Sequence, residues 1–141
     1  MSILSQRDAE AVTKEFERLA GPVTLTVFAS ELGGETNPQT VALVKEVVAL
    51  SDKLSLQEFN PYIDRDQAEV YGVEVTPAIV VEGARDYGIR FLGIPAGYEF
   101  SNLIDSIIVA STGEPALGVE TRNALEGLTE DVTIKVFTTP T

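Results

Sequence analysis

Apolar residues recur along this chain with two alternating periodicities, one helical and one extended. Between residues 5 and 19 the apolar side chains lie three or four positions apart, which predicts an amphipathic helix that Gly21 and Pro22 end. The next segment, VTLTVFA at 23–29, is rich in β-branched and aromatic residues and has too little polarity for an exposed strand. We therefore expect it to be a central strand of a sheet.

The same alternation continues to about residue 110. Apolar residues at helical spacing follow Pro38, which suits a first helical position with Asn37 as the N-cap. The further helices are predicted at 38–54, 64–71 and 99–110. The further strands are predicted at 54–60, 78–81 and 88–92, the last two as a hairpin. This order predicts an α/β protein with a thioredoxin-like fold, in which helices flank a central mixed four-stranded sheet.

The end of the chain repeats its beginning. VTIKVF at 132–137 nearly repeats VTLTVF at 23–28, at an offset of 109 residues (132 minus 23), and a helical stretch precedes each. We therefore predict a complete unit over residues 1–112. Residues 113–141 would then be a linker helix and the first strand of an incomplete second unit. An uncovered apolar strand would pair with another chain or fold against an edge of its own sheet.

Charge and residue content exclude several classes of function. The chain has 22 acidic and 10 basic residues, a formal net charge of −12, so its surface should repel nucleic acid. It contains no cysteine and no histidine, which excludes disulfides, thiol catalysis, thiolate metal sites and imidazole bases within this chain. The remaining carboxylates are typical of solvated surfaces. We accordingly expect no metal and no cofactor.

Targeting segments are not visible in the sequence. The longest apolar runs, 78–81 and 103–110, are too short or too broken by charge to span a bilayer, so no membrane association is expected. Residues 1–10 lack the basic start and apolar stretch of a signal peptide. These observations predict a cytoplasmic location.

Three stretches carry a resemblance to a known family. They are YGVEVTPAIVVEGARDYGIRFLGIPAGYEF at 71–100, SDKLS at 51–55 and VFTTPT at 136–141. Together they resemble the glutaredoxin-like protein disulfide oxidoreductases of archaea and thermophilic bacteria, which consist of two tandem thioredoxin-fold units. In that family each unit carries a Cys-x-x-Cys at the end of its first strand. Counting without a gap from 27–28 to 54–55 places the first pair on Gly34 and Asn37, so this unit lacks its redox cysteines.

The resemblance also concerns the last residues. The second Cys-x-x-Cys of the family follows directly after a VF-x-TPT sequence, and the sequence stops at Thr141, just before that pair would begin. The resemblance thus implies a unit without catalytic residues, whose parent protein would be a thiol-disulfide oxidoreductase.

Two segments are candidates for binding. The first is the segment before a predicted helix, which consists of Gly33, Gly34, Glu35 and Thr36. A helix N-terminus can bind an anion, although the carboxylates in this segment would repel one. The alternative is that the glycines only form a turn. The Thr76-Pro77 pair resembles the cis-proline of thioredoxin folds, whose neighbouring backbone binds an extended peptide. The alternative is that this turn only shapes the sheet. Both segments are expected beside each other, at the end of the central strands.

Three functions follow. The first is a redox-inactive unit that serves as a scaffold, or as a substrate or partner platform, for thiol-disulfide exchange carried by a second unit beyond residue 141. The second is a stand-alone thioredoxin-fold module that binds a peptide or protein through main-chain hydrogen bonds. The third is an enzyme that uses a non-thiol group near Glu35 or Thr36, and no polarising partner for either residue is visible. The expected partner is a protein or peptide, a second thioredoxin-like unit, or a second copy of the chain bound through 132–138.

Overall fold

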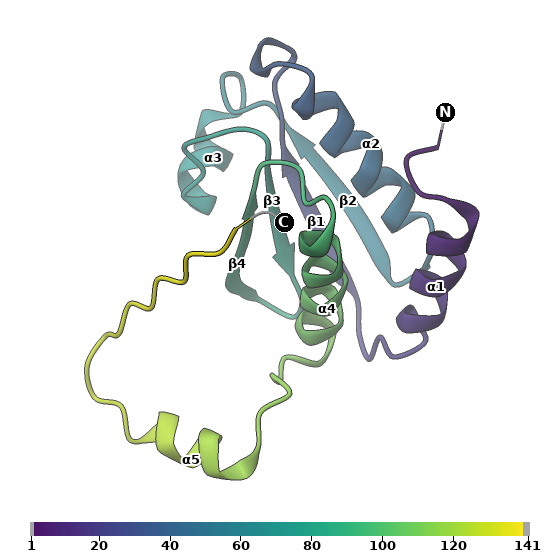
Figure 1. The fold of residues 1–141 in the computed structure, drawn as a ribbon. Helices are drawn as coiled ribbons and strands as arrows, with labels where there is room; N and C mark the ends of the chain where they lie inside the picture. The colour runs from purple at the N-terminus through teal and green to yellow at the C-terminus, as the bar shows by residue number, and fades with distance from the viewer. Residues whose placement is uncertain (1, 140–141) are drawn as a thin grey trace.

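The structure, a computed structural model, describes residues 2–139 and is built on one four-stranded sheet (Figure 1). The strands are β1 (Val23–Phe28), β2 (Leu54–Phe59), β3 (Ala78–Glu82) and β4 (Asp86–Leu92). They lie in the order β2-β1-β3-β4, with β1 parallel to β2 and antiparallel to β3, and β3 antiparallel to β4. The sheet is therefore mixed, as predicted, and β1 is one of its two central strands.

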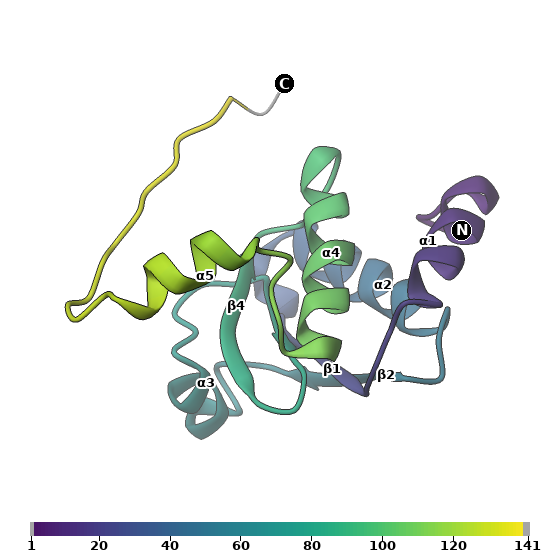
Figure 2. The same ribbon diagram turned by 90° about the horizontal axis from the view of Figure 1, so that it is seen from below.

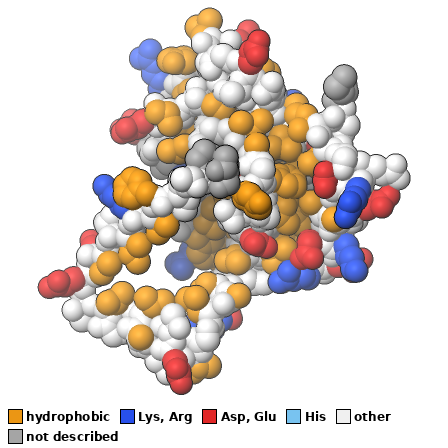
Figure 3. Space-filling model, viewed as in Figure 1, with side chains coloured by type: hydrophobic (Ala, Val, Ile, Leu, Met, Phe, Trp, Pro, Cys, Tyr) orange, Lys and Arg blue, Asp and Glu red, His pale blue; other side chains and the backbone are white. Residues whose placement is uncertain are grey.

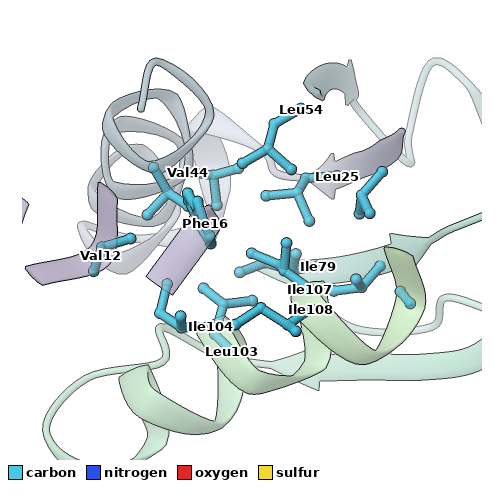
Figure 4. Close-up of a cluster of buried hydrophobic side chains, with 14 of the residues drawn as sticks. Val12, Phe16, Leu25, Val44, Leu54, Ile79, Leu103, Ile104, Ile107 and Ile108 are labelled. Carbon is cyan, nitrogen blue, oxygen red and sulfur yellow. The ribbon is translucent and has the colours of Figure 1, made fainter. Parts of the chain in front are cut away.

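The helices are α1 (Gln6–Phe16), α2 (Thr36–Val48), α3 (Arg65–Tyr71), α4 (Tyr98–Thr112) and α5 (Val119–Glu126), with a short 3₁₀ helix η1 (Glu31–Gly33). Helices α1 to α4 cover the two faces of this sheet, and a further helix, α5, lies away from it (Figures 1 and 2). Buried residues of α1, α2 and α4 form one apolar cluster with alternate residues of β1 and β3 (Figure 4). Residues of α3 pack on the opposite face, against Phe28 and Val80. The predicted α/β order and thioredoxin-like layout are confirmed.

Strand β1 shows why its sequence suits the centre of the sheet. Val23, Leu25 and Val27 point into the cluster under α1, α2 and α4, and each is 1% exposed or less. Phe28 belongs to the other face, where its ring lies 5.5 Å from that of Phe59 and 5.8 Å from that of Tyr71. Because both faces are covered, the strand tolerates few polar residues. Thr26 is buried as well, and its hydroxyl donates to Gln57 Oε1 at 3.3 Å.

Helix α2 begins differently from the prediction. Asn37 is not its N-cap, because the helix starts at Thr36 with Glu35 in the capping position, and Asn37 lies inside the first turn with its side chain buried. The helix also ends at Val48, not near residue 54, and residues 49–53 lead directly into β2. In this position the side-chain amide of Asn37 forms hydrogen bonds with Ser30 and Gly33 of the preceding loop, and not with the backbone N–H groups of the helix.

Residues 113–139 extend away from the sheet. The predicted helical stretch forms α5, but the segment 129–139 is extended, and residues 129–138 pair with no strand within residues 2–139 (Figures 1 and 2). The expectation that this segment folds against an edge of its own sheet is therefore wrong for the isolated chain. A strand needs a neighbouring strand for its main-chain hydrogen bonds, and the described part of the chain places none beside residues 129–138. The assignment of 113–141 to a second unit stays a prediction, and residues 140–141 lie outside the described part.

Candidate functional site

The loop that follows β1 leads through Gly34 to Asn37 in the first turn of α2, and the sequence predicts the family's first cysteine pair at these two positions. It contains η1, which Ser30 caps by accepting a hydrogen bond from Leu32 N at 3.2 Å. Ser30 itself is 4% exposed, so the loop starts inside the protein and reaches the surface at Leu32, which is 91% exposed. A short, closed turn therefore connects the central strand to α2.

Asn37 closes this turn from the helix side. Its Oδ1 accepts a hydrogen bond from Ser30 N at 2.9 Å, and its Nδ2 donates to the carbonyl of Gly33 at 2.7 Å. Asn37 is 1% exposed, so these bonds satisfy an amide that would otherwise be costly to bury. A Cβ atom at Gly33 would lie 2.4 Å from Asn37 Nδ2. Glycine at 33 and asparagine at 37 therefore fit together as a pair.

Gly34 is glycine for a different reason. Its backbone angles are φ 84° and ψ 177°, a region that residues with a side chain enter at a cost of about 1–3 kcal/mol. A Cβ at this position would meet no atom within 4 Å, so the backbone angle and not the available space selects glycine. At both positions where the family cysteines are predicted, the loop has a conformation suited to the residue actually present.

The Thr76-Pro77 segment lies at the same edge of the sheet. Its peptide bond is cis, as expected from the resemblance. The register pairs Ala78 with Phe28 on one side and with Leu92 on the other, and Pro77 O accepts a hydrogen bond from Gly93 N at 2.8 Å. The loops before β3 and after β1 therefore emerge together, although no hydrogen bond among residues 2–139 joins Thr76 or Pro77 to residues 33–36.

An open groove of about 910 Å³ lies between the β1–α2 loop and the β2–α3 connection. Its lining is mostly apolar and comes from η1, the first turns of α2, the end of β2 and the loop after it: Ala29, Ser30, Glu31, Leu32, Asn37, Pro38, Val41, Ala42, Lys45, Glu58, Asn60, Tyr62 and Ile63. The space-filling view shows apolar side chains exposed at this upper end of the molecule (Figure 3). The groove thus places an apolar concavity directly beside the loop.

The predicted binding residues do not line this groove. Gly33, Gly34, Glu35 and Thr36 form its neighbouring turn, and Thr76 borders a separate, more polar hollow of about 610 Å³ that also contains Arg65 and Glu74. Tyr62 borders both hollows. Sequence reasoning missed Tyr62 and Ile63, although two large apolar residues in an otherwise polar loop after Asn60-Pro61 were a usable signal.

A charged cluster ties α3 to the far edge of the sheet. Arg90 bonds Asp86 at 2.6 Å and donates from Nε and Nη2 to the carbonyl of Tyr71 at 3.2 and 3.1 Å. The hydrogen bond from Arg90 holds the pKa of Asp86 below its usual range. Burial, followed by the hydrogen bond to Glu82, raises the pKa of Tyr71. These residues face one another and line neither hollow, so their role is to hold α3 in place.

Carboxylates are the only strong metal-ligating side chains available to a chain without cysteine and histidine. Within residues 2–139 they form no group of three or more that could hold a metal ion. Over the same residues no helix has the length and apolar content that crossing a bilayer requires.

Comparisons with known proteins show which proteins this chain resembles in sequence and in fold. No known family model matches the chain. AhpF, a component of alkyl hydroperoxide reductase, is 28% identical in Xanthomonas campestris pv. phaseoli over 97 residues, which are 69% of this chain and 16% of that protein. The structure of AhpF of Enterococcus faecalis matches with a TM-score of 0.79 and 22% identity, over 89% of this chain and 61% of that one. A protein disulfide oxidoreductase from Aeropyrum pernix matches with a TM-score of 0.77 and 28% identity, over 90% and 57%.

These similarities confirm the thioredoxin-like fold and the resemblance to protein disulfide oxidoreductases. They also show that the chain spans only part of each relative, 16% of the Xanthomonas AhpF and 57–61% of the two solved chains. The absence of cysteine from the whole sequence agrees with a unit that performs no thiol chemistry itself.

Proposed function

We propose that this chain is the redox-inactive thioredoxin-like unit of a glutaredoxin-like protein disulfide oxidoreductase. In this proposal residues 1–112 serve as a scaffold, or as a substrate or partner platform, in the cytoplasm. Thiol-disulfide exchange is carried by a second unit that starts in residues 113–141 and continues beyond residue 141. The similarity to larger proteins of thiol and peroxide chemistry supports the proposal, because the chain matches only a part of each.

The observation that carries the proposal is the closed loop after β1. Asn37 is only 1% exposed, and an amide buried without hydrogen-bond partners would be costly. Instead, Asn37 bonds Ser30 and Gly33, and Gly34 has a backbone conformation suited to glycine. No buried polar side-chain atom among residues 2–139 lacks a hydrogen-bond partner. The loop is thus a well-packed structure in its own right, which favours a maintained structural or binding role over a decayed catalytic one.

The alternative is a stand-alone thioredoxin-fold module that binds peptides or proteins. The open apolar groove beside the loop favours it, because concave apolar surfaces with a few polar groups are typical binding sites. Both functions use the same face, and they differ in whether a thiol-bearing unit follows. Neither uses nucleic acid, since the net charge of −12 opposes phosphate backbones.

The test begins with the reading frame downstream of residue 141. We expect a Cys-x-x-Cys within the first few codons, and a frame without one would overturn the proposal and leave the binding module. The extended protein is then compared with its second unit alone in the reduction of insulin disulfides. A platform acts by binding, so removal of residues 1–112 should raise KM about tenfold and leave kcat unchanged.

Two further results decide the case. Equal kcat/KM with and without residues 1–112 would contradict a platform role. The 141-residue chain itself should not exceed a no-protein control in the same assay with dithiothreitol, because the nucleophile in such exchange is a thiolate and the sequence contains none.

A further inference from the structure

The groove between the β1–α2 loop and the β2–α3 connection combines apolar walls with negative charge. We propose that it binds a segment of a partner protein in which apolar side chains are flanked by lysine or arginine. This inference rests on the proposed function, because it assigns the partner-binding face of the same unit. It goes further in naming a surface that lies apart from Thr76 and Pro77 and in naming the chemistry of the partner.

The apolar part of the groove has three large side chains that are mostly exposed. Leu32 on one wall is 91% exposed, and Ile63 and Tyr62 on the other wall are 79% and 64% exposed. Pro38 and Val41, from the first turns of α2, line the groove between them. Large apolar side chains gathered on one surface are typical of interaction sites, whereas single scattered ones are not. An apolar segment of a partner would cover all three exposed residues at once.

Both walls are fixed before any partner binds. The hydrogen bonds of Asn37 hold the turn that presents Leu32. On the other side Asn60 Oδ1 accepts from Tyr62 N at 3.0 Å, and Asp64 Oδ2 accepts from Asn60 N at 2.8 Å. These short-range bonds hold the turn that presents Tyr62 and Ile63. A groove with fixed walls loses little conformational entropy on binding, which favours affinity.

The negative charge around the groove favours a partner segment that is basic. Its one lysine, Lys45, is bonded to Glu58 at 2.8 Å, so that pair carries no net charge. Glu31 remains as a carboxylate next to Leu32, and no hydrogen bond or ion pair of its side chain forms among residues 2–139. The adjacent hollow adds Glu69 and Glu74 against the single Arg65. Together with the net charge of −12, this field attracts a basic segment and repels an acidic one.

The same charge argues against the chain's own tail as the occupant. The apolar residues of the extended segment 129–139 are Val132, Ile134, Val136 and Phe137, but Glu130 and Asp131 precede them and outnumber its single basic residue, Lys135. A second copy of the chain would bring a further net charge of −12 to an acidic surface. A segment with flanking lysines or arginines brings the opposite sign, and it is therefore the occupant that the groove favours.

The experiment uses the ¹⁵N-labelled 141-residue chain and two synthetic octapeptides with blocked ends, KKLFVLKK and its acidic twin EELFVLEE. We expect the basic peptide to shift the backbone amide signals of Leu32, Val41, Tyr62 and Ile63. The acidic twin should bind about tenfold more weakly, and about 0.5 M salt should reduce the difference between the two peptides. Equal affinity of the two peptides would overturn the charge selection, and no shift in the groove with either peptide would overturn the site.

A matched pair of variants tests the position of the site. Ile63→Ser should weaken the basic peptide about tenfold, because it removes an apolar wall. Val70→Ser is the control, since Val70 is 76% exposed on α3, close to the 79% of Ile63, and lines neither hollow. Both substitutions are at exposed positions, so thermal melting should show that both variants stay folded. Equal losses from the two variants would overturn the assignment.

The outcome of the peptide experiment can be distinguished from the outcome of the test of the proposed function. Shifts confined to Thr76 and Gly93 would overturn this groove and still support a platform at the cis-proline. If the peptide binds in the groove but residues 1–112 have no effect on insulin reduction, the redox platform is overturned. The groove inference would then stand together with the alternative function, a binding module.

Discussion

Two segments of this chain have nearly the same sequence pattern and opposite environments. The first runs through α1 and β1, and the second runs through α5 and the extended tail, 109 residues later. The corresponding apolar pairs are Phe16 and Leu125, Leu19 and Leu128, Val23 and Val132, Leu25 and Ile134, Val27 and Val136, and Phe28 and Phe137. Every first member is 4% exposed or less, and every second member is 50% exposed or more.

The difference shows that the helix depends on its own residues, whereas the strand depends on neighbouring strands. Helix α5 forms without burying a residue, because a helix satisfies its hydrogen bonds internally. Residues 132–137 form no strand, because no strand within residues 2–139 pairs with them, whereas β1 is paired with β2 on one side and with β3 on the other. The correspondence also has a limit. Thr26 is fully buried in β1, and its counterpart is Lys135.

The largest expected effect comes from truncating one side chain in each segment. Leu25→Ala should lower the free energy of unfolding by about 2–5 kcal/mol, because it leaves a cavity under α1, α2 and α4. Ile134→Ala should change it by less than about 0.5 kcal/mol, since Ile134 is 81% exposed. Urea unfolding of the two variants measures both values. Similar losses would contradict the contrast between the segments.

The second prediction concerns the loop after β1. The side chain of Asn37 closes this loop with two hydrogen bonds, whereas no comparable loop follows residues 132–137 within residues 2–139. Gly33→Ala and Asn37→Ala should each lower the free energy of unfolding by about 1–3 kcal/mol, the first by a clash and the second by leaving Ser30 N and Gly33 O without their partner. Because the clash of the first involves the side chain that the second removes, the double variant should lose less than the sum. Additive losses in urea unfolding would show that the two residues act separately.

The third prediction concerns acid. The folded-state pKa of Asp86 lies below its ordinary value, because Arg90 bonds it and stabilises the charged form. The pair therefore stabilises the fold above the unfolded pKa of Asp86, and this contribution is lost as pH falls through the folded pKa. Since the Asp86 side chain is 34% exposed, we expect only about 0.5–1 kcal/mol. Asp86→Asn should remove this part of the acid dependence, measured as the difference in urea stability between neutral and acidic pH.

The acid dependence of stability also tests whether the tail supports the folded unit. Among residues 2–139 the hydrogen bonds of Asp86 and Arg90 all lie within residues 71–90, so a chain without residues 130–141 should keep the same acid dependence as the full chain. A weaker acid dependence after truncation would show that the tail supports the first unit.

The smallest effect on stability is expected from that truncation. Removing residues 130–141 should change the free energy of unfolding by less than about 0.5 kcal/mol, because the buried clusters lie within residues 12–110. Sedimentation should show that the full chain self-associates through 132–138 and that the truncated chain does not, with about 0.5 M salt present to screen the acidic surface. A monomeric full chain would contradict strand pairing, and unfolding of the truncated chain would assign the tail to the first unit.

Some features of the site were readable from single residues and some were not. The absence of every thiol and the glycine-rich turn before α2 follow from residue identity, whereas the match of Gly34 and Asn37 to the family cysteines stays a prediction from the resemblance. The role of Asn37 did not follow from residue identity, because the sequence favours it as an N-cap, and only the position of Ser30 and Gly33 in space turns its amide inward. The groove also required the structure, since Leu32 and Ile63 are 31 residues apart in the chain (63 minus 32).

The sequence by itself determined what depends on neighbouring residues and on composition. It established the order of helices and strands, the central position of β1, the acidic surface and the lack of thiol chemistry, because periodicity, turn residues and residue counts are local properties. Tertiary structure alone decided which of two similar segments became a strand, and which loop residues became a closed turn beside an apolar groove. Strand pairing, burial and hydrogen bonds between distant residues depend on what the rest of the chain places alongside a segment, and the segment's own sequence does not contain that information.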